Sequence, residues 1–583
     1  MDGIAFVDRK PRAVLVEVGI VFYFCLMTVI MTYPLILKMG HFIIGDIGDN
    51  IYFIWLFDWY TKAIFELKIS PFFNPYLNYP EGWNLASTDT TPVMVLLGYP
   101  VYLLTNPVMA FNFSMLLSFV LSGWSMYLWV KSLTLNRAAG LVAGTIFAFL
   151  PYRMAHFLVG HLNLCGTQWF PFYFWSLYVM FSQPRWSWKL VVGAAVSLGL
   201  IGFSGPYYIY MAILATGVFI AGYYLFTGVG QLRSFEPWKK MIGLSLFSLP
   251  FALAPMAPYI LLNTQEGLAS RTIAYASMYS ASPTDFLLPS TDHFLWGSWV
   301  GANFDRSLWT EATLYVGVVA GALALVAWIK RKESQHRALV SLSVLVGLFG
   351  LILAMGTDFH WLNHRVMVDL PEFLEELFQR SSIPIPLPGY FLVKYFPLYS
   401  KMRALMRFGI LTLVFTSLLA GLGSAWLINR VKPRWRGLMV AGLVALVFVD
   451  FYPGSYEQFT VISARPVDTW LASAPGQGAV VQFPAWQLEN QDQVYYTSVH
   501  NKPYVGGFFS ANQPDQYLRI RPVLDHFPDQ ASHLLLKDLG VQYVIVDSVH
   551  YADFPETRQR IEDLGLQFLV AIEGQYVFEL SQP

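Results

Sequence analysis

Two aspartates, Asp46 and Asp49, are the residues of this sequence whose spacing most clearly suggests chemistry. They lie three residues apart in Gly45-Asp-Ile-Gly-Asp-Asn50, shortly after the first long apolar stretch. A loop that contains Gly45 and Gly48 folds tightly, because glycine adopts backbone angles that other residues avoid. We therefore expect both carboxylates to point at one spot. There they either hold a divalent cation or accept a proton from a substrate hydroxyl, and the amide of Asn50 contacts the substrate.

A structural alternative exists for the same segment. Asp and Asn are good N-cap residues, so the segment also suits a polar turn that caps a helix over 51–66. That helix is almost wholly apolar and aromatic up to Asp58, and its Trp and Tyr residues favour the interface between lipid and water. We expect it to lie flat on the membrane surface.

A second group of polar residues follows in Pro151-Tyr-Arg-Met-Ala-His156 and at His161. A guanidinium such as that of Arg153 is always charged and binds phosphate in a bidentate manner. The two histidines are candidate metal ligands together with Asp49. Because they are five residues apart, they do not stack on one face of a helix. The alternative is that both histidines lie at the membrane interface and do not act as ligands.

Arg403 and Arg407 form a third group, and Glu81 is a separate candidate in the first outer loop. As i, i+4 neighbours, the two arginines lie on one face of a helix that enters a predicted span from its outer side. A lipid-phosphate headgroup explains cations there, and so does snorkelling of the side chains to the headgroups. Glu81 lies in the predicted tight turn Tyr79-Pro-Glu-Gly82, where it either contacts substrate or serves only the turn.

The composition places these residues in a membrane protein. The chain has 583 residues, of which 55% are apolar and 13% are charged, against about 25% charged residues in an ordinary soluble domain. Lys plus Arg and Asp plus Glu both number 37, so the net charge is zero and nucleic acid is excluded as a partner. The two cysteines lie in or beside apolar stretches and are interpreted as core residues.

A membrane span needs about 20 apolar residues. We predict eleven spans, some of them short, and interpret the proline-punctuated stretch 92–105 as an interfacial or re-entrant piece. The predicted spans are 14–36, 108–130, 138–151, 167–182, 189–204, 206–226, 241–262, 311–329, 338–356, 408–428 and 437–452.

The positive-inside rule orients these spans. With a cytoplasmic N-terminus that carries the basic segment 8–12, the short loops rich in Lys and Arg all fall on the cytoplasmic side. The long loops 37–107, 263–310 and 357–407 then face outward, and so does the C-terminal tail. The acidic and histidine residues gather on these outer loops, so any chemistry is expected at the outer face of the cytoplasmic membrane.

The tail, residues 456–583, has the composition of a separate domain, whereas residues 1–455 form the membrane part. Apolar, β-branched stretches predict buried strands over 480–483 and 541–547 and two more strands around Gly574. Helical stretches over 531–539 and 555–564 alternate with these strands. We expect a small α/β extracytoplasmic domain.

Taken together, the Gly45–Asn50 segment, the turn at Glu81 and the segment from Arg153 to His161 resemble the GT-C glycosyltransferase superfamily. The resemblance is to large bacterial multi-span proteins of the cell envelope, relatives of protein mannosyltransferases and of enzymes that use polyprenyl-phosphate sugars. It covers about residues 1–455.

The resemblance implies a function. Members use an acidic residue of the first outer loop, matching Asp46 or Asp49 here, as a general base or a metal ligand. The donor is a sugar on polyprenyl phosphate, and the acceptor is a glycan, a lipid or a protein. Cations such as Arg153, Arg403 and Arg407 stabilise the leaving phosphate. Some members use Mg²⁺ or Mn²⁺, but this chain lacks a clear Asp-x-Asp.

Two other classes of function remain open. A non-catalytic envelope protein that binds or translocates lipid-linked glycans would carry the same loops. A coupled transporter is disfavoured, because no chain of acids or histidines runs through the predicted spans.

Overall fold

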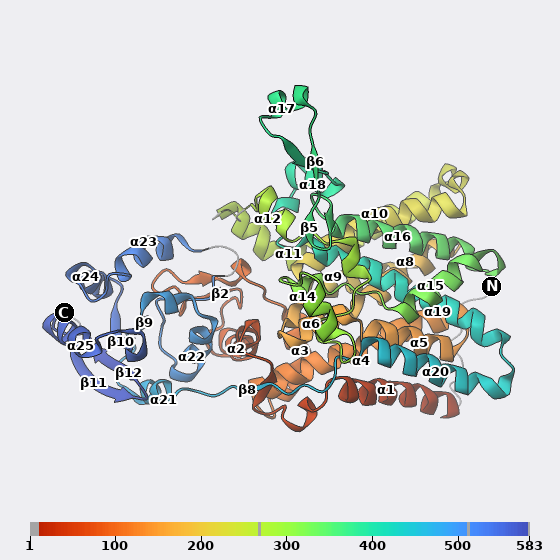
Figure 1. Ribbon diagram of the computed structural model, residues 1–583. Helices are drawn as coiled ribbons and strands as arrows, with labels where there is room; N and C mark the ends of the chain where they lie inside the picture. The colour runs from red at the N-terminus through yellow and green to blue at the C-terminus, as the bar shows by residue number, and fades with distance from the viewer. Residues whose placement is uncertain (1–10, 266, 268–269, 510–512, 581–583) are drawn as a thin grey trace.

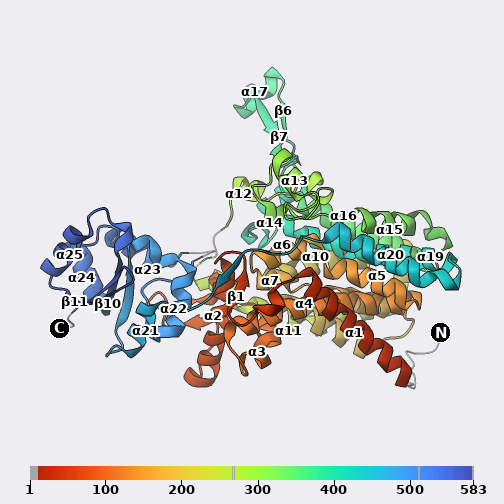
Figure 2. The ribbon, with the colours of Figure 1, turned by 60° about the horizontal axis from the view of Figure 1, so that its bottom comes forward.

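The computed structural model describes residues 11–580 apart from 266, 268–269 and 510–512, so most of the basic segment 8–12 lies outside the described residues. Two parts are visible, a bundle of long helices and a smaller C-terminal α/β domain at one end of it (Figures 1 and 2). Each of the eleven predicted spans falls on a helix. These helices are α1 (Pro11–Met31), α4 (Pro107–Thr134), α5 (Arg137–Ala148), α8 (Trp169–Ser182), α9 (Trp188–Ser204), α10 (Pro206–Thr227), α11 (Phe235–Gln265), α15 (Val318–Ile329), α16 (Arg337–Ala354), α19 (Gly409–Arg430) and α20 (Pro433–Phe451).

Within the described residues, seven helical segments are long and apolar enough to cross a membrane. One is α5 continued by α6 (Pro151–Leu158), and another is α19 with the turn before it. The structure therefore supports seven membrane spans by length and composition, whereas the sequence predicts eleven. Helices α8, α9 and α15 have only 14, 17 and 12 residues, and α20 carries Arg434, Arg436 and Asp450.

The loop over 37–107, predicted to be outer and called the first outer loop below, holds β1 (Phe42–Ile44), α2 (Asp49–Thr61), β2 (Phe73–Asn74), β3 (Trp83–Asn84) and α3 (Pro92–Tyr102). The sequence predicts that helix α2 lies flat on the membrane surface, and the structure differs from this prediction. Nearly all residues of α2 are buried, because it packs against α4 and against α22 (Gln491–His500) of the C-terminal domain. Its aromatic side chains therefore form the core that joins the two parts of the molecule. With 11 residues, α3 is too short to span, in agreement with the predicted interfacial piece.

The later outer loops contain short elements that surround the mouth of the bundle. A hairpin arm of β6 (Met367–Asp369), α17 (Glu372–Phe378) and β7 (Ser382–Pro384) projects from this region (Figures 1 and 2). The elements are α7 (Leu162–Cys165), α12 (Ile273–Met278), α13 (Gly297–Asn303), α14 (Trp309–Ala312), β4 (His360–Trp361), β5 (His364–Arg365), β6 (Met367–Asp369), α17 (Glu372–Phe378), β7 (Ser382–Pro384) and α18 (Pro388–Tyr395).

The C-terminal domain contains a four-stranded mixed sheet in the order β11-β12-β10-β9. The central strand β10 (Val541–Asp547) runs parallel to β9 (Ala479–Phe483) and antiparallel to β12 (Gln575–Glu579), which pairs with β11 (Gln567–Ile572). Helices α21 (Pro466–Ser473), α23 (Asp515–Leu524), α24 (Gln530–Asp538) and α25 (Phe554–Asp563) accompany the sheet. The predicted strands and helices of the tail are confirmed.

Strand pairing ties the start of the tail to the first outer loop. Strand β8 (Phe459–Val461) pairs antiparallel with β1, and the backbone N–H of Gly45 donates to the carbonyl of Gln458 at 3.0 Å. The segment that carries Asp46 and Asp49 is therefore fixed by residues more than 400 positions away in the chain.

Candidate active site

A cavity of about 430 Å³ opens where the first outer loop, the later outer loops and the C-terminal domain meet. Each of these regions contributes lining residues, so the cavity forms only when the whole chain has folded. Its acidic and basic lining residues are Asp49, Asp89, His161, Arg271, Glu311, Lys401, Arg403 and Arg407.

Asp49 is placed by the turn that precedes α2. Gly48 is the N-cap residue, and its N–H donates to Oδ1 of Asn50 at 2.9 Å, while Nδ2 of Asn50 donates to the carbonyl of Asp46 at 2.9 Å. Gly160 packs against Asn50 so closely that a Cβ at residue 160 would lie 2.4 Å from the Cβ of Asn50. Asn50 is therefore buried and structural. It does not line the cavity, so the prediction that its amide contacts the substrate is corrected.

The carboxylate of Asp49 faces the cavity, with 42% of its side chain exposed. Its Oδ2 lies 3.3 Å from Nε2 of His161. Withdrawal from bulk water tends to raise the pKa of Asp49, but the hydrogen bond and charge of His161 and the charges of Arg403 and Arg407 outweigh it. The net effect lowers the pKa, so Asp49 is ionised at neutral pH.

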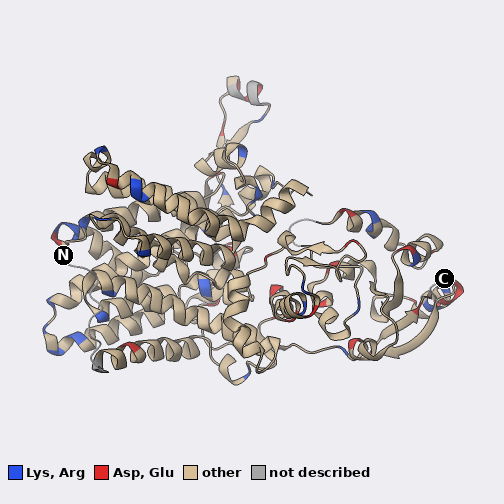
Figure 3. Ribbon diagram, turned by 180° about the vertical axis from the view of Figure 1, so that it is seen from behind, with Lys and Arg blue, Asp and Glu red and all other residues tan. Residues whose placement is uncertain are grey.

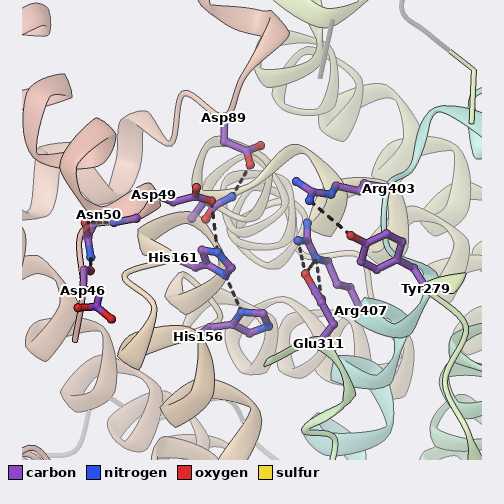
Figure 4. A network of polar contacts seen from close by, with 12 residues as sticks. Asp46, Asp49, Asn50, Asp89, His156, His161, Tyr279, Glu311, Arg403 and Arg407 are labelled. Atoms are coloured by element: carbon purple, nitrogen blue, oxygen red, sulfur yellow. Dashed lines mark hydrogen bonds and ion pairs between the residues drawn. The ribbon is translucent and has the colours of Figure 1, made fainter. Parts of the chain in front are cut away.

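Asp46 does not share this cavity. It is exposed, and its Oδ1 accepts a hydrogen bond of 2.6 Å from Nε2 of Gln458. Figure 4 shows it apart from the side chains that surround Asp49. The prediction that both carboxylates converge on one spot is wrong, because the start of α2 turns Asp49 inward while the β1–β8 pairing keeps Asp46 at the surface.

His161 and His156 extend the line of contacts that begins at Asp49 (Figure 4). Their Nδ1 atoms are 2.9 Å apart, and His156 is fully buried with its ring against Tyr152. We predicted that these three residues bind a metal. Each contact of His161 is made by a different ring nitrogen, so the three side chains form a chain and do not converge. No group of three or more His, Cys, Asp or Glu residues in the described part of the protein is arranged to hold a metal.

Arg407 and Arg403 line the cavity on another side. Arg407 is buried and pairs with Glu311, its Nη2 donating to Oε1 at 2.5 Å and its Nε lying 3.1 Å from both carboxylate oxygens. Arg403 is partly exposed, its Nη2 lies 3.5 Å from the hydroxyl of Tyr279, and its Cζ lies 5.7 Å from the centroid of the same ring. The two arginines do not lie on one helix, since α19 begins at Gly409 and Arg407 belongs to a 3₁₀ turn, Leu405–Phe408.

Glu311 was not predicted as a site residue. Burial tends to raise its pKa, but the charge of Arg407 beside it lowers the pKa to about 2. Glu311 opens the predicted span 311–329, and an ionisable residue at the mouth of a span is the same signal that identified Arg407. The position of Glu311 at the start of the predicted span is therefore the sequence signal that could identify it.

Asp89 is a second carboxylate in the cavity that we did not predict as a site residue. Its Oδ2 accepts a hydrogen bond of 2.6 Å from Nδ2 of Asn163, which follows His161 in the chain. Burial raises the pKa of Asp89 to about 6, with the negative charge of Asp49 adding to the effect. The cavity thus holds one carboxylate with a lowered pKa and one with a raised pKa.

Two other predicted substrate-binding residues lie elsewhere. Arg153 is fully buried and does not line the cavity, and its guanidinium donates to the carbonyls of Ala148 and Cys165 at 2.7 and 3.1 Å. Glu81 is on the surface and pairs with Arg519 of the C-terminal domain at 2.6 Å. Both predictions are corrected. Arg153 is a structural cation that binds carbonyls, and Glu81 joins the two parts of the molecule.

Residues 16–420 match the model of a protein family described as a domain of unknown function (DUF6311), and the chain belongs to that family. No curated protein matches the chain in sequence.

Solved structures show what the fold is. The chain is similar to a variant of the arabinofuranosyltransferase AftD from Mycobacteria, with a TM-score of 0.55, 13% identity, and coverage of 97% of this chain and 42% of that one. It is also similar to the oligosaccharyltransferase of Archaeoglobus fulgidus tethered with an acceptor peptide, with a TM-score of 0.51, 12% identity and coverage of 97% and 74%. The apo form of that enzyme gives a TM-score of 0.50 at 11% identity, with coverage of 99% and 75%. The protein therefore has the fold of GT-C glycosyltransferases, as the sequence motifs indicated.

The pairing of Glu311 with Arg407 yields a stability prediction. Glu311→Gln keeps the shape of the side chain but leaves a buried guanidinium without its counter-charge, which costs about 3–5 kcal/mol. We expect a clearly lower thermal midpoint in detergent, measured by intrinsic fluorescence. Glu333→Gln is the control, because Glu333 forms exposed pairs with Lys330 and Arg430 and its loss should barely move the midpoint. Equal shifts for both variants would contradict the interpretation.

The raised pKa of Asp89 yields a pH prediction. Between about pH 4 and pH 6 the folded protein keeps the Asp89 proton that the unfolded chain has released, so this group stabilises the fold at low pH and the effect is lost as pH rises through about 6. Asp89→Asn lacks the titration. Thermal midpoints from pH 4 to 8 should show the variant gaining stability relative to the wild type as pH rises. A difference that stays constant with pH would show that Asp89 does not titrate in this range.

Proposed function

We propose that the protein is a membrane glycosyltransferase that transfers a sugar from a polyprenyl-phosphate-linked donor to an acceptor on the outer face of the cytoplasmic membrane. One observation carries the proposal: Asp49 of the first outer loop shares a single cavity with Arg403 and Arg407. The GT-C fold supports it, because the solved proteins of this fold are named as glycosyl-transferring enzymes.

Asp49 is the proposed general base. Its pKa is lowered, so it is ionised and able to accept a proton at neutral pH. In the proposed step the acceptor hydroxyl gives its proton to Asp49, and its oxygen forms a bond to the anomeric carbon of the donor sugar. The bond between that carbon and the phosphate oxygen breaks, and the phosphate leaves with the electron pair.

The arginines are proposed to stabilise the leaving phosphate. Arg407 is engaged by Glu311 in a bidentate contact, so its contribution to substrate is its long-range charge. Arg403 makes only a long hydrogen bond to Tyr279 within the described residues and offers its remaining donors to a phosphate. The role that we predicted for both arginines thus falls mainly to Arg403.

The orientation of the chain in the membrane is part of the proposal. Figure 3 shows Lys and Arg gathered at the end of the helix bundle opposite the C-terminal domain. From the positive-inside rule we infer that this end faces the cytoplasm, with the N-terminus inside and the cavity and the C-terminal domain outside. Lipid-linked sugars would then enter from the outer leaflet of the bilayer.

The proposed step assigns no metal to Asp49, His156 and His161, because these three side chains form a chain of contacts and do not converge on one point. A requirement for Mg²⁺ or Mn²⁺ stays a prediction that a chelator tests in the same assay. The alternative function, binding or translocation of lipid-linked glycans without catalysis, uses the same cavity and differs by the absence of turnover.

The test is turnover by the purified full-length protein supplied with polyprenyl-phosphate sugars, followed as loss of the donor. We expect Asp49→Asn to lower the rate by about 10²- to 10⁴-fold, because it removes the general base. Asp46→Asn is a matched control, since Asp46 lies outside the cavity, and it should retain the wild-type rate. Equal loss in both variants, or no turnover with lipid binding intact, would contradict the proposed function.

A further inference from the structure

The C-terminal domain reaches into the cavity through a single segment of the described residues, Lys502–Phe509. The backbone of this segment runs beside the first outer loop: the N–H of Asn78 donates to the carbonyl of Gly506 at 2.8 Å, and the N–H of Tyr504 donates to that of Tyr76 at 2.7 Å. The hydroxyl of Thr88 donates to the carbonyl of Phe508 at 3.1 Å. These bonds fix the position of Phe508 at the cavity wall.

Glycines allow this close approach. A Cβ on Gly506 would lie 1.9 Å from the carbonyl oxygen of Leu488, so only glycine fits at that position. Gly507 meets the ring of Phe509 in the same way, with a Cβ at 2.7 Å. Phe508 follows directly, and its half-buried ring faces the cavity. The ring is therefore presented by a backbone that has little freedom to move.

Phe508 forms one wall of the cavity with Tyr52 of α2, and the two ring centroids are 5.4 Å apart. Tyr52 is fully buried, yet its hydroxyl has no hydrogen-bond partner among the described residues. The carboxamide oxygen of Asn163, also buried and at the cavity wall, lacks one too. Leaving buried polar groups unpaired is costly, so a ligand that pairs them is favoured.

We propose that this wall is a binding site for a sugar ring, completed by Phe508 of the C-terminal domain. A sugar has an apolar C–H face that packs on aromatic rings and hydroxyls along its edge. The hydroxyl of Tyr52, the carboxamide oxygen of Asn163 and the carboxylate of Asp89 are the partners that those hydroxyls need. The hydrocarbon of a prenyl chain would leave the hydroxyl of Tyr52 and the carboxamide oxygen of Asn163 unpaired.

This inference deepens the proposed function, and the sugar has two possible sources. It belongs either to the lipid-linked donor or to a carbohydrate acceptor. In either case the C-terminal domain is a specificity-determining part of the site, and Phe508 and Tyr52 are the residues that contact the ring.

The test uses three variants at two positions, Phe508 and Tyr52, and measures binding without turnover. The probes are methyl α-mannopyranoside, methyl β-glucopyranoside and methyl α-arabinofuranoside, titrated into the full-length protein and followed by ligand-observed NMR. We expect Phe508→Leu to weaken binding about three- to tenfold and Phe508→Tyr to keep it. Tyr52→Phe should weaken binding about fivefold. If Tyr52 is merely structural, Tyr52→Phe leaves binding unchanged, because removing an unpaired buried hydroxyl does not harm the fold.

The control is Trp486→Ala, which removes an exposed aromatic residue of the same domain that does not line the cavity and should leave binding unchanged. If no glycoside binds the wild type, or if Phe508→Leu and Tyr52→Phe bind as the wild type does, the inference is overturned. Binding that depends on Phe508 in a protein that consumes no lipid-linked sugar would support the site and contradict the proposed function.

Turnover separates the two sources of the sugar. With undecaprenyl-phosphate mannose as donor and the glycosides as acceptors, a raised KM for the donor in Phe508→Leu assigns the wall to the donor sugar. A raised KM for the glycoside assigns it to the acceptor. Turnover with neither KM changed leaves the proposed function standing and rejects the sugar site.

Discussion

The charge of Arg407 is withdrawn from water at the mouth of a helix bundle, and Glu311 is what makes this tolerable. A buried guanidinium without a counter-ion is costly, and the two residues come from segments 96 positions apart. Their pairing fixes the start of α19 against α14 and so fixes the wall that also carries Arg403. Across the cavity, the carboxylate of Asp49 contacts His161, and the carboxylate of Asp89 accepts a hydrogen bond from Asn163. Every carboxylate of the cavity therefore has a dedicated partner, whereas Arg403 retains donors for a ligand.

The cavity is also where three distant parts of the chain meet. The first outer loop is held between the helix bundle and the C-terminal domain, by the β1–β8 pairing on one side and by the bonds from Asn78 and Thr88 to the 504–508 segment on the other. This arrangement explains why α2, which is rich in aromatic residues, is buried. It also makes the C-terminal domain part of the site, since the domain contributes Phe508 to the wall.

Local pattern was enough to predict the elements, and it was not enough to predict which way several side chains point. Each of the eleven predicted apolar stretches falls on a helix of the bundle, and the alternation of strands and helices in the tail matches the observed sheet. Asp49, Arg403 and Arg407 were recognised because ionisable residues at the mouths of spans need a reason to be there. Asp46, Glu81 and Arg153 carried the same kind of signal. Their actual partners are Gln458, Arg519 and a set of backbone carbonyls, which lie far away in sequence or emerge only once the chain has folded.

The central claim is that a lipid-linked sugar places its phosphate against Arg403 and its sugar toward Asp49. A structure of the full-length protein in a lipid nanodisc with bound undecaprenyl phosphate, determined by electron cryo-microscopy, tests it most directly. We expect density for the phosphate within hydrogen-bond distance of the Arg403 guanidinium, with the prenyl chain leaving the cavity toward the bilayer. Phosphate density outside the cavity, or an occupied cavity in which Arg403 makes no contact with the phosphate, would contradict the account.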